Sequence, residues 1–149
     1  MRPLFRKLRI KQLARALQPF IAAKDSPHPQ KGWLRAIREA TGITVRQMAT
    51  RLGKAPTLVV NLEKSEAEYR ITLGSLRAAA DALGCQLVYA LVPKSGSIQD
   101  LAERRARAKA AENVRAVEHS MALEDQAVGG IDNKIEEETR RILKRDEKK

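Results

Sequence analysis

Cysteine is nearly absent from this chain of 149 residues, because Cys85 is the one example. A single cysteine cannot form an internal disulfide, and its scarcity favours a reducing compartment. No apolar run approaches the length of about 18 residues that a membrane span requires. The N-terminus is basic but lacks the apolar core and the small-residue cleavage site of a secretory signal. We therefore expect a cytoplasmic protein without a membrane partner.

Common signatures of enzymes are missing as well. The sequence contains no glycine-rich phosphate loop and no cluster of metal ligands, and no histidine lies near Cys85 along the chain. A small buried side chain explains Cys85 better than a nucleophile does. His28 precedes Pro29 in a segment with the composition of a linker. We expect no enzymatic activity, no cofactor and no metal site.

The sequence does contain a large and unevenly placed positive charge. The formal net charge is +11. Residues 1–31 hold eight Lys or Arg residues against one acid, residues 32–94 hold nine against five, and residues 95–149 hold twelve against twelve. The excess in the first two thirds favours a polyanion such as double-stranded DNA as partner. The alternative is charge that serves solubility alone.

Two short helical patterns joined by a tight turn lie between Ile43 and Ser65. Thr44 is suited to cap the first helix, and Gly53 tolerates the left-handed conformation at its end. Pro56 is suited to the first position of the second helix. The apolar positions with helical spacing are Met48, Ala49, Leu52, Val59 and Leu62. This pattern is typical of a helix-turn-helix, with an ordinary helical hairpin as the alternative.

The stretch resembles the helix-turn-helix domains of phage repressors and Cro-like proteins, over roughly residues 33–84. The resemblance implies a scaffold helix over residues 44–52 and a recognition helix over residues 56–64. It also implies an ion pair between Arg38 and Glu63, because buried charges need partners.

Thr57 and Asn61 are four residues apart and share one face of the expected recognition helix. Asparagine can pair with adenine through two hydrogen bonds, and Val60 is suited to contact a thymine methyl group. The cationic side chains nearby are suited to phosphates. The residues that we expect at the DNA interface are Thr44, Arg46, Lys54, Thr57, Val60, Asn61 and Lys64.

The expected fold is mostly α: a Cro/repressor-like helix-turn-helix bundle with one C-terminal β-strand and a long helical tail. The core helices are expected at about 33–41, 45–52, 56–64 and 73–83. Inward-facing residues are expected to include Trp33, Leu34, Ile37 and Ala40 in the first of these helices, and Leu73, Leu76, Ala79, Ala80 and Leu83 in the last. Residues 86–92 have the composition of a strand. A lone strand leaves its backbone groups unpaired, so we expect a homodimer formed through Leu87, Tyr89 and Leu91 of this segment.

Three domains are expected on these grounds. Residues 1–31 form a basic helix and a linker, residues 32–94 form the helix-turn-helix domain with its dimerisation strand, and residues 95–149 form the tail. The apolar stripe expected along the basic helix consists of Phe5, Leu8, Leu13, Leu17 and Ile21. This stripe is expected to dock the helix on the domain as an arm that touches phosphates, and a membrane-surface helix is the alternative.

The tail is expected to hold two helices separated by Gly129 and Gly130. Ser97 is suited to cap the first, which reaches about residue 128, and the second covers residues 131–146. Apolar residues that lie close to one face of the first helix are Val114, Val117, Met121 and Val128. Such a stripe beyond the DNA-binding core suggests a protein partner. The alternative is that the tail folds back on its own domain.

Ser120 and Glu124 are four residues apart and share a helical face. The segment around them resembles the Ser/Thr-x-x-x-Glu inhibitory helix of antitoxins that silence Fic-type AMP-transferases. The whole chain resembles the family called mobile mystery protein A, which is typically paired with a Fic-domain partner. The resemblance runs through residues 31–40, 83–93 and 119–126.

That resemblance implies an antitoxin that binds DNA, autoregulates its operon and inhibits a Fic-domain toxin. Glu124 would occupy the toxin arginine that should hold the nucleotide γ-phosphate, and Ser120 would support it with a hydrogen bond. Val114, Val117 and Met121 would dock the tail on the toxin. The alternative is a simple dimeric transcriptional regulator with a structural tail, in which Ser120 and Glu124 lie on a solvated helix face.

Overall fold

The computed structural model of the chain describes residues 3–123 and 130–148. In these residues the backbone forms seven helices and no strand. They are α1 (Pro3–Ala22), α2 (Trp33–Ala40), α3 (Val45–Leu52), α4 (Pro56–Ala67), α5 (Leu73–Ala82), α6 (Ile98–Leu123) and α7 (Ile131–Lys148). The prediction of a mostly helical chain is confirmed. No helix among the described residues combines the length and the apolar character needed to cross a membrane.

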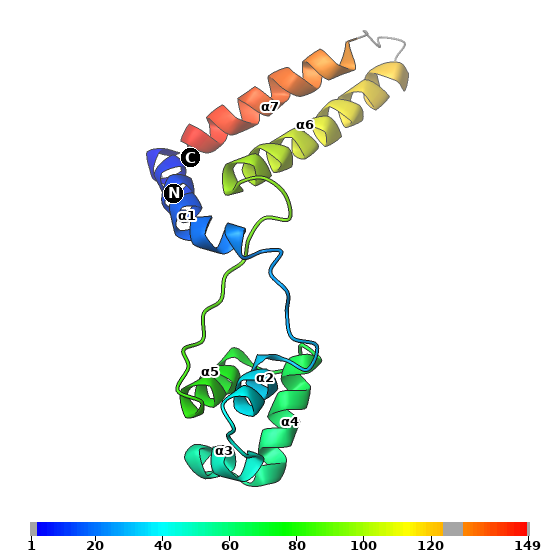
Figure 1. Cartoon of the computed structure of the whole chain (residues 1–149). Helices are drawn as coiled ribbons and strands as arrows, with labels where there is room; N and C mark the ends of the chain where they lie inside the picture. Colours follow the sequence, from blue (N-terminus) through cyan, green and yellow to red (C-terminus); the bar gives the residue numbers. More distant parts are fainter. Residues whose placement is uncertain (1–2, 124–129, 149) are drawn as a thin grey trace. The chain divides into compact units, whose positions relative to one another are not determined.

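The helices divide between two compact units (Figure 1). The central unit consists of residues 25–89 and contains α2 to α5. The terminal unit consists of residues 1–24 together with residues 90–149 and contains α1, α6 and α7. This division differs from the expected one, because the two ends of the chain belong to one unit and the helix-turn-helix segment is inserted between them.

The core of the central unit is small and forms where its four helices meet. Its buried members are Leu34, Met48, Ala49, Val59, Ala79 and Leu83. Three expectations for this core are wrong, because Trp33, Ala40 and Leu73 are exposed. Trp33 is the first residue of α2, and its ring packs edge-on against His28 with ring centroids 5.6 Å apart. A residue at the end of a short helix lies beyond the crossing helices that would cover it.

The expected strand over residues 86–92 is absent from the described structure, and this prediction is wrong for the single chain. The segment continues after α5 without regular structure, and its side chains are largely solvated, Leu91 being 86% exposed. A strand is held by hydrogen bonds to a neighbouring strand, and the described residues supply none. Strand-like composition is therefore not sufficient here.

The terminal unit is built on a helical hairpin in which α6 and α7 lie side by side and antiparallel (Figure 1). Ala106, Ala110 and Val114 recur every four residues on α6, and they pack against Ile135 and Ile142 of α7. Small alanine side chains let the two helices approach closely. The tail therefore forms its own packed core, and Val114 belongs to that core.

The third helix of this unit, α1, contacts both α6 and α7. Leu17 is buried and Ile21 is half-buried, as the expected stripe requires. Phe5, Leu8 and Leu13 are exposed, which contradicts the rest of that stripe. Leu8 lies on the opposite side of the helix from Leu17 and Phe5 lies well around from it, whereas Leu13 shares the face of Leu17 and is exposed all the same.

Candidate nucleic-acid interface

The first helix of the predicted motif, α3, begins at a complete capping box. Thr44 is its N-cap, and its Oγ1 accepts a hydrogen bond from the backbone N–H of Gln47 at 3.1 Å. In the reciprocal hydrogen bond, Gln47 Oε1 accepts from the backbone N–H of Thr44 at 2.8 Å. Two donors that helix formation leaves unpaired are satisfied in this way. The prediction that Thr44 caps this helix is confirmed.

The turn between α3 and α4 follows the predicted chemistry. Gly53 ends α3 with φ of 64°, in the left-handed region that favours glycine. The next residue closes the turn, since the Lys54 backbone N–H donates to the carbonyl of Ala49 at 3.0 Å. Pro56 is the first residue of α4, where its missing N–H costs no hydrogen bond. The local sequence thereby sets the direction in which α4 leaves α3.

α4 has one buried face and one solvated face. Val59, Glu63 and Glu66 are buried against the other helices. The expected base-reading residues Thr57, Val60 and Asn61 are exposed, as is Lys64. Thr57, Asn61 and Lys64 follow helical spacing, so the structure brings them onto one accessible surface. α4 also runs to Ala67, three residues beyond its predicted end.

An ion pair between Arg38 and Glu63 ties α2 to α4. Arg38 Nε donates to Glu63 Oε1 at 2.5 Å, and Nη2 donates to Oε2 at 3.2 Å. A further guanidinium nitrogen of Arg38 donates to the carbonyl of Ile43 at 3.2 Å. The hydrogen bond to Glu63 raises the pKa of Arg38 above its usual value, against the opposing effect of burial. The pair between Arg38 and Glu63 was predicted and is confirmed, and the structure adds that it is bidentate.

Sequence reasoning missed Glu66, the second buried carboxylate of α4. Its two oxygens accept from the backbone N–H groups of Trp33 at 2.9 Å and Leu34 at 2.8 Å, so it caps α2 from another helix. Gly32 has φ of 82°, and a β-carbon there would lie 2.6 Å from Glu66 Oε2. The signal was present, because an acid at the spacing of Val59 and Glu63 on a buried helical face must have donors.

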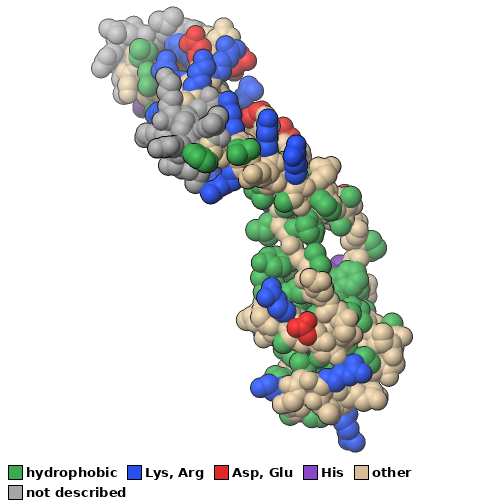
Figure 2. Space-filling model, turned by 90° about the vertical axis from the view of Figure 1, so that its left-hand side faces the viewer, with side chains coloured by type: hydrophobic (Ala, Val, Ile, Leu, Met, Phe, Trp, Pro, Cys, Tyr) green, Lys and Arg blue, Asp and Glu red, His purple; other side chains and the backbone are tan. Residues whose placement is uncertain are grey.

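From α3 through the turn to Lys64 of α4, every exposed charged side chain is positive. Arg46, Lys54 and Lys64 are solvated, whereas Glu63, the one acid between residues 43 and 65, is buried in its ion pair. Arg51 has a structural contact that was not predicted, since its Nη1 donates to the carbonyl of Ala82 at the end of α5 at 3.1 Å. Lys and Arg side chains stand out on the lower part of the central unit in Figure 2. This surface favours a polyanion.

Metal chemistry has no support in the part of the chain that the structure describes. No group of three or more His, Cys, Asp or Glu side chains is arranged to hold an ion there. Cys85 is half-buried beside the central core, and its Sγ lies 3.8 Å from the carbonyl oxygen of Leu83.

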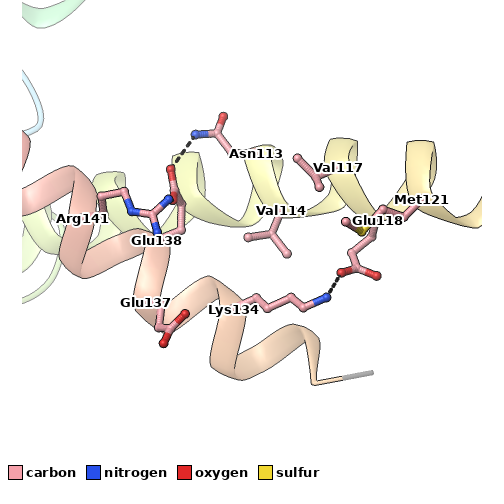
Figure 3. Close-up of a pocket in the computed structure, with 9 residues that line it drawn as sticks. All are labelled: Asn113, Val114, Val117, Glu118, Met121, Lys134, Glu137, Glu138 and Arg141. Carbon is pink, nitrogen blue, oxygen red and sulfur yellow. Dashed lines mark hydrogen bonds and ion pairs between the residues drawn. The ribbon is translucent and has the colours of Figure 1, made fainter. Parts of the chain in front are cut away.

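The predicted toxin-docking residues lie differently along α6. Val114 is 8% exposed and covered by α7, whereas Val117 is 54% exposed. Both valines and the half-buried Met121 line a groove of about 390 Å³ between α6 and α7 (Figure 3). Ser120 is exposed on α6, and Glu124 lies outside the described residues. Of the two valines predicted to dock the tail, Val114 is thus covered within the chain and Val117 remains accessible.

Charged residues of the two helices line the same groove. Glu118 of α6 pairs with Lys134 of α7, and Asn113 Nδ2 donates to Glu138 Oε1 at 3.4 Å (Figure 3). Arg141 pairs with Glu138 along α7 at 3.2 Å. The contacts of Glu118 with Lys134 and of Asn113 with Glu138 tie α7 to α6 along the groove that Val117 also lines.

The three predicted dimerisation residues lie in the extended segment after α5. Leu87 is half-buried, whereas Tyr89 and Leu91 are exposed. No backbone hydrogen bond links residues 86–92 to other described residues. The segment thus presents both apolar side chains and unpaired backbone groups.

A helix-turn-helix family model matches residues 34–89, which contain most of α2, all of α3 to α5 and the extended chain up to Tyr89. These residues form a helix-turn-helix domain of the Cro and phage-repressor type, and this domain supports a DNA-binding role in transcriptional regulation. The match does not extend to α1, α6 or α7. Comparison with curated proteins and with solved structures gave no match for the chain.

Proposed function

We propose that this chain, through its helix-turn-helix domain, is a sequence-specific regulator that reads DNA with α4 in the major groove. The observation that carries the proposal is the division of α4 into two faces. Its buried face is held by the ion pair with Arg38 and by the Glu66 cap, and its solvated face presents Thr57, Asn61 and Lys64. A rigid recognition helix with a free polar face is what this mode of binding requires.

The contacts divide into base reading and positioning. Asn61 is proposed to pair with adenine through two hydrogen bonds, with Thr57 beside it and Val60 against a thymine methyl group. Arg46, Lys54 and Lys64 are proposed to hold phosphates, as is the exposed start of α3 at Thr44. Positioning contacts add affinity for any sequence, so specificity rests on Asn61 and Val60.

A homodimer accompanies this proposal. Tyr89 and Leu91 are exposed in a segment whose backbone groups have no described partner, and a second copy could supply one. Two copies would place two recognition helices on neighbouring half-sites. Light scattering at micromolar concentration is the test. A monomer whose behaviour is unchanged by Tyr89→Pro would contradict the dimer.

To test the DNA contacts, a random duplex library is first selected for binding to the full-length protein, and the selected sequence serves as the operator. Asn61→Ala should weaken binding to that operator by about 1–3 kcal/mol and relax the preference for adenine at one position. Asn133→Ala is the matched control, because Asn133 is an exposed asparagine on α7 of the terminal unit. Lys64→Ala should instead reduce the salt dependence of binding by a slope of about 0.9. Unchanged affinity and unchanged selectivity in Asn61→Ala would reject the assignment.

A second candidate function is inhibition of a Fic-domain toxin by α6. The observation that favours it is the accessible pair Val117 and Ser120, which lies beyond the buried part of the hairpin beside Met121. The proposed docking surface is therefore Val117 with Met121, while Val114 keeps its place in the hairpin core. The proposed blocking group is Glu124, supported by Ser120.

Two classes of substitution separate docking from inhibition. Val117→Asp should abolish co-purification with the toxin, because an exposed apolar anchor is replaced by a charge. Glu124→Gly should leave the complex intact and release AMP transfer, measured as self-modification with labelled ATP. Full inhibition by the Glu124→Gly protein would reject the blocking role even if the complex forms.

A further inference from the structure

A second groove lies elsewhere in the terminal unit, and neither proposed function uses it. Its volume is about 640 Å³, and α6 supplies most of its lining, with Arg6 from α1 and Ile142 from α7. The lining from α6 begins at Ile98 and ends at Glu112. At 1.5 Å per residue this stretch is about 21 Å long, roughly four helical turns. The groove therefore has the length of a short helix.

The lining from α6 begins with the apolar residues Ile98, Leu101 and Ala102, and charged residues join it from Arg105 onward. Leu101 is exposed and Ile98 is half-buried, so each has surface left to bury. Ala102, Ala106 and Ala108 continue this lining with small side chains. Because alanine occupies little space, another helix could approach α6 closely at Ala102 and Ala108, whereas Ala106 is already packed against α7.

The charged residues that line the groove are mostly basic. They are Arg6, Arg105, Lys109 and the single acid Glu112. The helix beside the groove, α1, adds to this field, since it contains five Lys or Arg residues and no acid. A groove lined by both apolar and cationic side chains has its complement in a helix with leucine on one face and carboxylates beside it.

We propose that this groove docks an acidic amphipathic helix of a partner protein. Leu101 and Ile98 would meet the apolar side chains of that helix, and Arg105 and Lys109 would meet its carboxylates. DNA fits less well, because phosphates gain nothing from an apolar strip. A membrane surface also fits less well, because the strip on α6 is mainly alanine, where interfacial helices present Trp, Phe or Leu.

The probe is a fluorescein-labelled helical peptide with leucine at helical spacing and glutamate elsewhere, titrated with the full chain in a fluorescence-anisotropy assay. Its matched partner has lysine at every glutamate position. At about 0.15 M salt, where exposed charges are screened beyond roughly 8 Å, the acidic peptide should bind at least about tenfold more tightly than the basic one.

Substitutions in the chain then locate the site. Arg105→Glu with Lys109→Glu should weaken binding of the acidic peptide by about tenfold or more, and Leu101→Asp should do the same. Arg107→Glu is the control, since Arg107 is an exposed cation on α6 that does not line the groove. The affinity of this variant for the acidic peptide should stay within about twofold of the parent's. Circular dichroism checks that each variant keeps its helices.

Three results would overturn the proposal. The first is equal binding of the two peptides, and the second is equal loss in the Arg107→Glu control. The third is displacement of the acidic peptide by random-sequence duplex DNA, or by vesicles of phosphatidylserine and phosphatidylcholine, if that binding is also lost in the Leu101, Arg105 and Lys109 variants. The DNA-binding and toxin-binding proposals do not depend on this outcome.

Discussion

At the scale of single residues, two carboxylates hold the recognition helix in place. Glu63 binds the guanidinium of Arg38, and Glu66 caps the start of α2 through two backbone N–H groups. Both acids belong to α4 and both are buried, so α4 reaches α2 through charge as well as through Val59. The position of the solvated face of α4, which we propose reads DNA, thus depends on two side chains buried on its other face.

Removing one member of the buried ion pair should destabilise the central unit strongly. Glu63→Gln leaves Arg38 as a buried charge without its counter-ion, and the expected loss in free energy of unfolding is about 3–5 kcal/mol. Urea unfolding followed by the fluorescence of Trp33, the one tryptophan of the chain, measures it. The double variant Arg38→Met with Glu63→Leu should regain most of that loss, because no charge is then buried.

Glu39→Gln provides the control for this prediction. Glu39 pairs with Arg35 at 2.7 Å on the exposed side of α2, and a solvated pair contributes at most about 1 kcal/mol. A loss in Glu63→Gln no larger than the loss in Glu39→Gln would show that the buried pair does not stabilise the central unit.

At the scale of elements, the ends of a helix are set by adjacent residues, whereas its buried face is set by helices distant in sequence. α6 begins at a reciprocal pair, in which the Ser97 backbone N–H donates to Asp100 Oδ2 at 2.6 Å and the Asp100 N–H donates to Ser97 Oγ at 3.1 Å. Four residues suffice to form this cap. The faces of α6, by contrast, are covered by α7 and α1, and no neighbouring residue indicates which face each one takes.

The cap of α6 should make the terminal unit sensitive to acid. The hydrogen bond from the Ser97 backbone N–H lowers the pKa of Asp100, so the folded unit prefers the ionised carboxylate. A depressed pKa adds stability above the unfolded pKa of about 3.9, and this stability is lost as pH falls through the lower, folded value. The melting temperature of Asp100→Asn should therefore lie below that of the parent at neutral pH. The gap should narrow as pH falls below the unfolded pKa of about 3.9, and an equal gap at neutral and at acidic pH would contradict the role of the cap.

Two valines on α6 allow burial to be separated from helix propensity. Val114→Ala removes two methyl groups from the hairpin core and should cost about 2 kcal/mol of unfolding free energy, reduced by the better helix propensity of alanine. Val117→Ala gains the same propensity at an exposed position, so its stability should match or slightly exceed that of the parent. Thermal unfolding followed at 222 nm compares them. Equal effects would mean that α7 does not cover Val114 in solution.

At the scale of the whole molecule, the chain consists of two units with separate cores. The central core is formed by α2 to α5, and the hairpin core by α6 and α7. α1, at the other end of the sequence, contributes to the terminal unit. The terminal unit is thus closed by contacts between the first and the last helices of the chain.

Separate cores predict unfolding transitions that do not coincide. Trp33 reports on the central unit alone, whereas far-ultraviolet circular dichroism reports on both. Ile142→Asp buries a charge in the hairpin core, so it should shift the transition seen by circular dichroism and leave the Trp33 midpoint unchanged. Coincident transitions that move together would show that the two units unfold as one.

The sequence by itself determined the features that depend on a few adjacent residues. Thr44, Gly53 and Pro56 set the ends of α3 and α4, because caps and turns are formed by groups within about one helical turn. Ser97 caps the start of α6 for the same reason. Periodicity then placed Met48, Ala49 and Val59 in the core, and composition placed the positive charge.

Only the tertiary structure decided which face of each helix is buried and which other helix covers it. Val114 and Val117 are both valines on α6, yet α7 buries one and leaves the other solvated. Trp33 lies outside its core, α1 packs on the tail helices, and Glu66 caps a helix 33 residues away in sequence. The expected strand did not form, because pairing needs a second strand that the described chain does not provide. Burial and pairing are properties of two surfaces in contact, whereas the sequence of one segment describes only one of them.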